Sequence, residues 1–477
     1  MPCKRIKVIN YLSDFGSVNF WSNISKNKID NDLEFIKECG FDSIIVMLPY
    51  ASFKPNLSNF ETEYTEIFDY LISSCKQKKI YVILRIGYLW EESFQEDRTF
   101  ERYTKIYKYI CKNILIRKLE YKTKEKLLYE DFISFIKHYS SKIDIYHSFL
   151  SWEDFFWPIK YATNLNSDDD LDKETNKIIK HIINRINSDK LHVEHRTNAH
   201  CNPINTNDSK IHYGYYNTGS ICGEWFDLIS CKLKQNTIIY KNLTLEKNFL
   251  EWLSRIIKTF KLDDPSNKFI LNQFNFYDNT LENFKDSSFH NHLLEKQDIE
   301  RAISFIDFIQ PLAKLYFQGI GFWNLWSTIS GQIYNGCFIY GLRGWQTSGK
   351  LLQTKQAVYL GNNDELLSNL GYIRISDKSE INFCIEYNSD IHCNLLVYLG
   401  SSFKKIVVQP QTKRVQYKFN SFEKRQIRIV CKCEQNQGIE ITRIDAWKNT
   451  HESMIFDYDR KPTELWSKKL KMFIKDF

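Results

Sequence analysis

Short apolar runs recur along the first 350 residues, and longer stripes of helical period separate them. Each run is continuous rather than alternating, which is typical of parallel strands covered on both faces. The runs are Lys4–Tyr11, Phe41–Leu48, Ile80–Ile86, Ile143–Glu153, Leu191–Arg196, Phe226–Cys231, Lys268–Phe274 and Gly319–Trp326. Eight strand and helix units predict a closed (β/α)8 TIM barrel. An open doubly wound sheet is the alternative, but no glycine-rich phosphate loop follows the first run.

The period changes after about Gly349. Apolar residues now alternate with polar ones in short runs, and long helical stripes are missing, which is typical of antiparallel strands. The alternating positions include Ile381, Phe383, Ile385, Tyr387, Val415, Tyr417, Phe419, Ile427 and Ile429. We therefore predict an α/β barrel over residues 1–350 and an antiparallel β-sandwich accessory domain with a tail over residues 351–477.

Composition and charge narrow the function classes. The net charge is +7, but the lysines are spread along the chain, so we expect no nucleic-acid partner. No apolar run reaches membrane-spanning length, and twelve cysteines show no regular framework. The N-terminus lacks a signal-peptide pattern, so we expect a cytoplasmic protein as written, or a periplasmic or secreted one if a signal was removed. The oligomeric state stays open.

Polar residues end several of the predicted strands, and the C-terminal strand ends form the active-site face of such barrels. These residues are Arg85, Glu153, Glu194, His195, Arg196, Asn272, Gln273, Trp323 and Trp326. Glycoside hydrolysis needs an acid beside the leaving oxygen and a second group on the other face of the sugar. The ends of the fourth and seventh strands, at Glu153 and Gln273, lie far apart in sequence but can meet across a barrel.

Four segments resemble the clan of retaining barrel glycosidases that holds cellulases, mannanases and β-galactosidases. SFLSWED resembles the strand that carries the acid/base, and FILNQFNF the strand that carries the nucleophile. VILRIGYLWEE and GFWNLWS resemble the third and eighth strands. The resemblance implies a carbohydrate substrate, no cofactor, and Glu153 and position 273 as the catalytic pair. It also implies substrate binding by Arg85 and Trp323. From their places at or beside strand ends we further expect substrate contacts from Trp152, His195, Asn272 and Trp326.

Two departures from the clan's pattern bear on activity. The clan has Asn before the acid, where this chain has Trp152, and it has Glu at the nucleophile position, where this chain has Gln273. An amide cannot form a stable glycosyl-enzyme ester. Three explanations stay open: an inactivated variant, a natural relative that only binds glycan, or a second carboxylate such as Glu194 or Glu224 in that role. A transglycosidase or glycosyltransferase on the same barrel is a further alternative.

Other polar clusters have plainer interpretations. Glu194, His195 and Arg196 are more typical of a structural ion-pair cluster than of catalysis. The spacing of His192, His195, His200, His212 and Cys201 matches no standard zinc pattern, so we expect no metal. The aromatic segment HYGYYN, ending at Asn217, is compatible with a loop that lines the site. Trp323 and Trp326 lie three residues apart, so at most one of them shares the barrel axis with Gln273.

Overall fold

The computed structural model describes strands and helices of both halves of the chain. The described residues are 5–11, 20–54, 60, 62–88, 124–151, 155, 168–187, 191–196, 216–217, 226–227, 234–235, 238–239, 246, 249–250, 253–254, 257–258, 270–274, 276–277, 296–322, 325, 328–329, 333, 335–339, 341–342, 344–369, 381–400, 402–410, 414–419, 426–449, 455–456 and 461–477.

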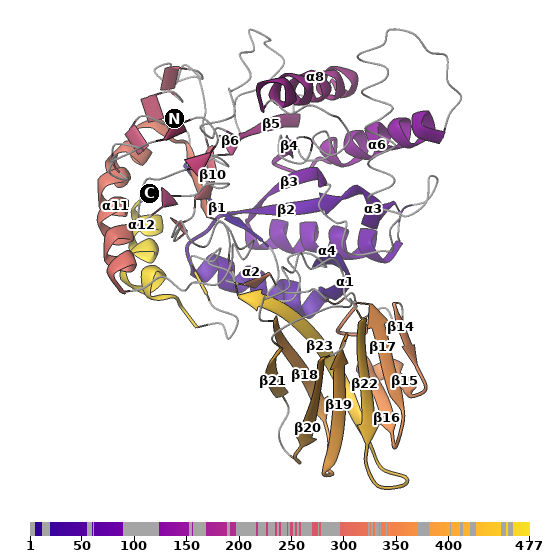
Figure 1. The fold of residues 1–477 in the computed structure, drawn as a ribbon. Coiled ribbons are helices and arrows are strands. Elements are labelled where there is room, and N and C mark those ends of the chain that lie inside the picture. The colour runs from indigo at the N-terminus through magenta and orange to yellow at the C-terminus, as the bar shows by residue number, and fades with distance from the viewer. Residues whose placement is uncertain are drawn as a thin grey trace.

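Eight parallel strands close into a barrel in the order β1-β12-β10-β6-β5-β4-β3-β2 (Figure 1). Their bounds are β1 Ile6–Asn10, β2 Ser43–Pro49, β3 Tyr81–Tyr88, β4 His147–Ser151, β5 Leu191–Arg196, β6 Tyr216–Asn217, β10 Ile270–Phe274 and β12 Gly319–Phe322. The continuous apolar runs thus become strands buried on both faces, as β2 shows with every residue buried. The predicted fold class is confirmed.

The predicted sixth strand was wrong. Residues 226–227 form β7 (Phe226–Asp227), which pairs with β11 (Phe276–Tyr277) in a separate two-stranded sheet. The sixth place in the barrel belongs to β6, within the segment that we expected to be a loop. Tyr216 of β6 pairs with His195 on one side and with Leu271 on the other. A strand of two residues is too short to appear as an apolar run in the sequence.

Helices surround the barrel strands (Figure 1). Their bounds are α1 Phe20–Asn23, α2 Lys26–Glu38, α3 Tyr50–Phe53, α4 Thr62–Lys78, α6 Lys124–Ser140, α8 Asp168–Ile186 and α11 Lys296–Tyr316. Helix α2 shows how local sequence sets these ends. The Ser25 hydroxyl caps it by accepting from the Lys28 N–H at 3.3 Å, and Gly40 ends the turn with a φ of +93°.

The barrel has an inner and an outer apolar core. Six residues form the inner cluster, which fills the barrel: Ile6, Val8, Ile45, Ile83, Phe149 and Ile270. The outer cluster joins the other faces of the strands to the helices. Because successive strand residues point to opposite faces, the inner residues also identify which later positions on the same strands face the barrel interior.

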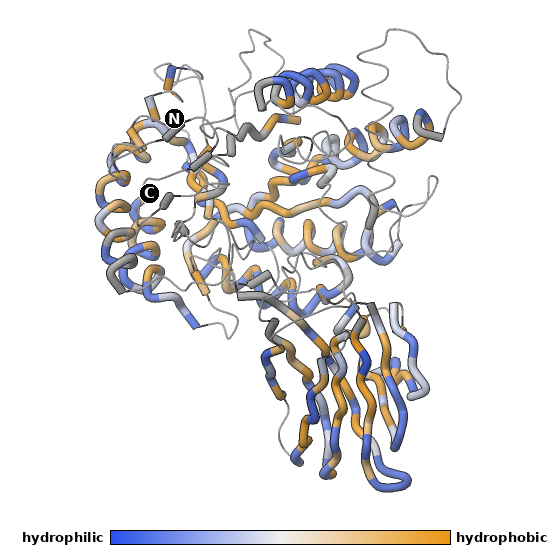
Figure 2. Tube along the Cα trace, viewed as in Figure 1, coloured by the Kyte–Doolittle hydropathy of each residue, from blue (hydrophilic) through white to orange (hydrophobic). Residues whose placement is uncertain are grey.

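Two antiparallel sheets pack as the predicted β-sandwich. The five-stranded sheet has the order β14-β17-β22-β19-β20, and the other runs β15-β16-β23-β18-β21 with β13 beside β23. Their bounds are β13 Thr328–Ile329, β14 Trp345–Thr347, β15 Lys350–Leu352, β16 Ala357–Gly361, β17 Glu365–Asn369, β18 Ile381–Asn388, β19 Cys393–Leu399, β20 Ser402–Val408, β21 Arg414–Phe419, β22 Gln426–Lys432 and β23 Gly438–Asn449. Figure 2 shows the mixture of polar and apolar positions along these strands. Strand β19 alternates strictly between buried and half-buried residues, as period two requires.

The end of the chain returns to the barrel after β23. A π-helical turn, Trp466–Leu470, continues into α12, Lys471–Asp476, which lies beside α11 (Figure 1). Phe473 packs edge-on against Phe322 of β12, and Trp466 stacks on Phe41. These residues belong to the outer barrel cluster. No helix in the described ranges combines the length and apolar character that a bilayer crossing needs.

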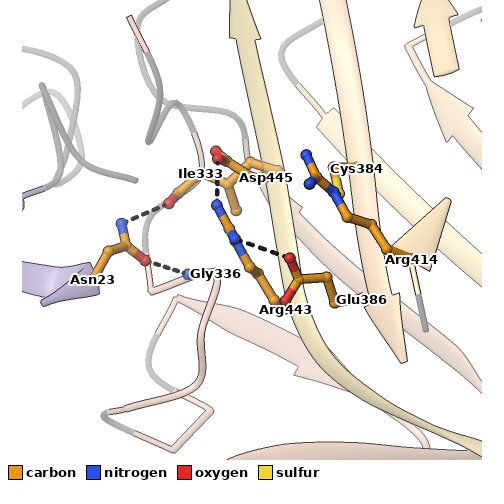
Figure 3. A network of polar contacts seen from close by, with 8 residues as sticks. All are labelled: Asn23, Ile333, Gly336, Cys384, Glu386, Arg414, Arg443 and Asp445. Atoms are coloured by element: carbon orange, nitrogen blue, oxygen red, sulfur yellow. Dashed lines mark hydrogen bonds and ion pairs between the residues drawn. The ribbon is translucent and has the colours of Figure 1, made fainter. Parts of the chain in front are cut away.

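A contact between Asn23 and the segment around Gly336 links the barrel to the sandwich (Figure 3). Asn23, at the end of α1, donates from Nδ2 to the Ile333 carbonyl at 3.2 Å and accepts the Gly336 N–H at 2.9 Å. Gly336 in turn accepts the N–H of Ile444 on β23. A Cβ at Gly336 would lie 2.1 Å from the Ile444 carbonyl oxygen, so only glycine fits this contact.

Candidate functional site

The C-terminal ends of the barrel strands bring buried polar residues to one rim. Asn10 ends β1, Arg85 lies near the end of β3, Ser151 ends β4, and Asn272 lies in β10. Their exposed fractions are 1%, 3%, 1% and 0%. Each follows an inner-cluster residue by two positions on its strand, so all four positions face the barrel interior. This is where active sites of such barrels form.

Strand β4 leads to the predicted acid. Its last residue, Ser151, pairs with Glu194 of β5. The Ser151 Oγ is buried and has no hydrogen-bond partner among the described residues. Trp152 and Glu153 follow directly, but both lie outside the described residues. The structure therefore places the strand that delivers Glu153, and the position of its carboxylate stays a prediction.

Strand β10 has an irregular register at the predicted nucleophile position. Leu271 pairs with Ile320 and Phe274 pairs with Phe322, so three steps along β10 match two along β12. Strand β10 therefore has one more residue than β12 in this stretch, within the pair Asn272 and Gln273. Such an insertion is a β-bulge. Bulges re-aim side chains and are over-represented next to active sites. The backbone of Gln273 is described within β10, whereas its side chain lies outside the described residues.

Asn10, the last residue of β1, holds this bulge through its side-chain amide. Its Nδ2 donates to the Asn272 carbonyl at 2.8 Å and to the Phe322 carbonyl at 2.9 Å. Gly321 makes room, because a Cβ there would lie 2.6 Å from the same Asn272 oxygen. Sequence reasoning missed Asn10 and Ser151. The signal was present as one polar residue ending each apolar run.

Arg85 lies where the sequence predicts a substrate-binding residue. Its position pairs with Met47 of β2 and with Phe149 of β4, and Phe149 is part of the inner cluster. The Arg85 side chain has an interaction partner in the structure. A guanidinium at this depth favours an acidic or hydroxyl-bearing neighbour, because an unpaired buried charge is costly.

The predicted histidine and tryptophan ligands are placed only in part. His195 lies in β5, but its side chain is outside the described residues, as are Trp323 and Trp326. His192 bonds His147 ring to ring at 2.9 Å, between β5 and β4. Among the described residues, no group of three or more His, Cys, Asp or Glu side chains could hold a metal ion.

Comparison with known proteins finds likeness in structure only. No protein-family model matches the chain, and no curated protein matches it. A glycoside hydrolase family 5 mannosidase from Rhizomucor miehei is 14% identical, with 68% of this chain and 83% of that chain covered and a TM-score of 0.40. GH5_18 from Streptomyces cattleya, in complex with GlcNAc, is 9% identical, with coverage of 68% and 72% and a TM-score of 0.43. The exo-β-1,4-mannosidase Op5Man5 from Opitutaceae bacterium strain TAV5 is 9% identical, with coverage of 68% and 52% and a TM-score of 0.40.

Proposed function

We propose that this chain is built as a retaining glycoside hydrolase for an oligosaccharide or polysaccharide. Strands β4 and β10 stand in one closed barrel, separated by β5 and β6. Parallel strands end at the same rim, so SFLSWED and FILNQFNF leave the barrel toward one mouth. Retaining chemistry requires its two groups roughly 5–5.5 Å apart across the sugar.

The observation that carries the proposal is a pair of buried polar atoms at this mouth. Asn10 Oδ1 and Ser151 Oγ have no hydrogen-bond partner among the described residues. A buried acceptor or hydroxyl left unpaired costs about 1–3 kcal/mol, so such atoms favour a polar occupant. A sugar ring, which carries several hydroxyls, supplies the required donors and acceptors.

The roles follow from the chemistry of the two positions. Glu153 protonates the leaving oxygen and then takes a proton from the attacking water. The side chain at position 273 is where a carboxylate would form the glycosyl-enzyme ester. Arg85 and Trp323 shape the site around the reacting sugar. Trp152, His195, Asn272 and Trp326 contribute further substrate contacts.

A second function is favoured by one observation, the amide of Gln273. Glu to Gln preserves shape and hydrogen-bonding capacity but removes the nucleophile. The chain as written would then hold a glycan without cleaving it. The two functions share one binding site and differ in a single atom of one side chain.

The test restores the carboxylate by Gln273→Glu and uses β-linked manno-, gluco- and galacto-oligosaccharides as substrates. We expect hydrolysis by this variant and none by the parent chain. Glu153→Gln in the restored background is the matched control, and it should lose hydrolysis while keeping binding. Binding without hydrolysis in every variant supports the glycan-binding function. Neither binding nor hydrolysis by any variant refutes both.

A further inference from the structure

We propose that Asn10 is a positioning residue that fixes the Asn272 and Phe322 carbonyls, and so the backbones of β10 and β12, relative to each other. The effect on catalysis rests on the proposed function, whereas the effect on the backbone does not. Asn10 reaches both strands with one planar amide, whose Nδ2 donates to the Asn272 and Phe322 carbonyls. Two carbonyl oxygens at 2.8 and 2.9 Å require a donor, so the nitrogen faces them.

The two accepting carbonyls belong to the peptide bonds that precede the predicted site residues. The Asn272 carbonyl is part of the peptide unit that joins Asn272 to Gln273. The Phe322 carbonyl is part of the unit that joins Phe322 to Trp323. A peptide unit is planar, so fixing its C=O also fixes the direction in which the next Cα leaves. One side chain therefore ties the peptide unit that leads to the nucleophile position to the end of β12.

The bulge creates the need for this contact. In a regular ladder the strands pair residue by residue, but the extra residue in β10 takes its neighbours off the ladder. Gly321 lets the displaced Asn272 backbone approach, since any side chain there would collide with it. Asn10 supplies a donor to the Asn272 carbonyl at this break in the regular register. Its own position is fixed because Ile9 pairs with Phe322.

Two simpler accounts of Asn10 make different predictions. Its Oδ1 can accept from a sugar, as the proposed function requires, while Nδ2 holds the backbone. If the Oδ1 contact were the whole role, Asn10→Asp would keep that acceptor and should bind ligand better than Asn10→Ala. If the amide nitrogen holds the two carbonyls, an ionised carboxylate cannot donate to them and repels them. Asn10→Asp should then be at least as harmful as Asn10→Ala. A simple packing role predicts that Asn10→Leu restores what Asn10→Ala loses.

The backbone arm of the test uses amide hydrogen exchange in the full chain. We expect Asn10→Ala and Asn10→Asp to speed exchange in peptides spanning 270–274 and 319–325 by roughly tenfold, as the loss of two hydrogen bonds allows. Ile9→Val is the matched control, because it removes one buried methyl from the neighbouring position on the same strand. Unchanged exchange in both peptides, or equal change in the control, overturns the proposal.

The activity arm repeats these variants in the Gln273→Glu background. We expect kcat to fall on the order of 10²-fold in Asn10→Ala, with a smaller change in KM, because misplacement by about 1 Å has that effect on rate. Unchanged kcat overturns the catalytic part of the proposal. If the Gln273→Glu chain shows no hydrolysis at all, the proposed function fails, and the exchange experiment still decides whether Asn10 orders the two strands.

Discussion

Removal of the Asn23 side chain tests whether the contact between α1 and the segment around Gly336 holds the sandwich on the barrel (Figure 3). Asn23 is buried, and its amide makes two hydrogen bonds to backbone groups more than 300 residues away in sequence. Asn23→Ala removes both bonds and leaves the Ile333 carbonyl and the Gly336 N–H without them in a buried place.

The structure sets the size of the expected loss. Each buried group left unpaired costs about 1–3 kcal/mol, so the two groups together predict a loss of about 2–6 kcal/mol in the free energy of unfolding. Asn23→Asp keeps an acceptor for the Gly336 N–H but loses the donor to Ile333. It also buries a charge that repels the Ile333 carbonyl, so its loss should be at least as large as that of Asn23→Ala.

The assay is urea unfolding, followed by circular dichroism and by tryptophan fluorescence in parallel. In Asn23→Ala we expect the two transitions to separate, because the barrel and sandwich no longer share this contact. Asn27→Ala, at an exposed position of the adjacent helix α2, is the control and should change stability by less than about 0.5 kcal/mol. A loss equally small in Asn23→Ala would refute the reasoning.

Three further predictions concern two buried contacts and one partly exposed histidine. Gly321→Ala should destabilise the chain by about 1–3 kcal/mol in urea unfolding, because its Cβ collides with the Asn272 carbonyl; an unchanged midpoint would contradict that close approach. Arg443→Met leaves the buried Asp445 carboxylate without the guanidinium that contacts it at 3.3 Å, and should cost about 3–5 kcal/mol. The double change Arg443→Met with Asp445→Leu should recover most of that loss, and failure to recover would mean that charge is not the cause. Burial lowers the pKa of His138, so its stabilising contribution is complete above about pH 6.5 and is lost as the pH falls through the lower folded-state pKa. His138→Gln should therefore flatten the loss of stability between pH 7.5 and pH 5, and an unchanged slope would count against this assignment.

The sequence identified elements wherever a local pattern was long enough. Helix α2 follows the apolar stripe of Ile29, Leu33 and Ile36, and Gly40 lies just past its end. Strand β6 carries none of these local signals. It is identified only by its pairing with β5 and β10. The return of the chain to α11 after β23 was likewise unpredicted, since Trp466 and Phe473 acquire their partners only in the folded barrel.

The sequence by itself determined the parallel barrel, the sandwich, and the strands from which the candidate site is built. Those properties follow from the period of apolar residues, which acts over a few positions. Only the tertiary structure decided how the site is assembled. Asn10 lies 262 residues from Asn272 and 312 from Phe322, so closure of the barrel alone brings its amide to their carbonyls. The bulge at Gln273 is decided in the same way, because a register shift is a relation between two strands and no single stretch of sequence contains it.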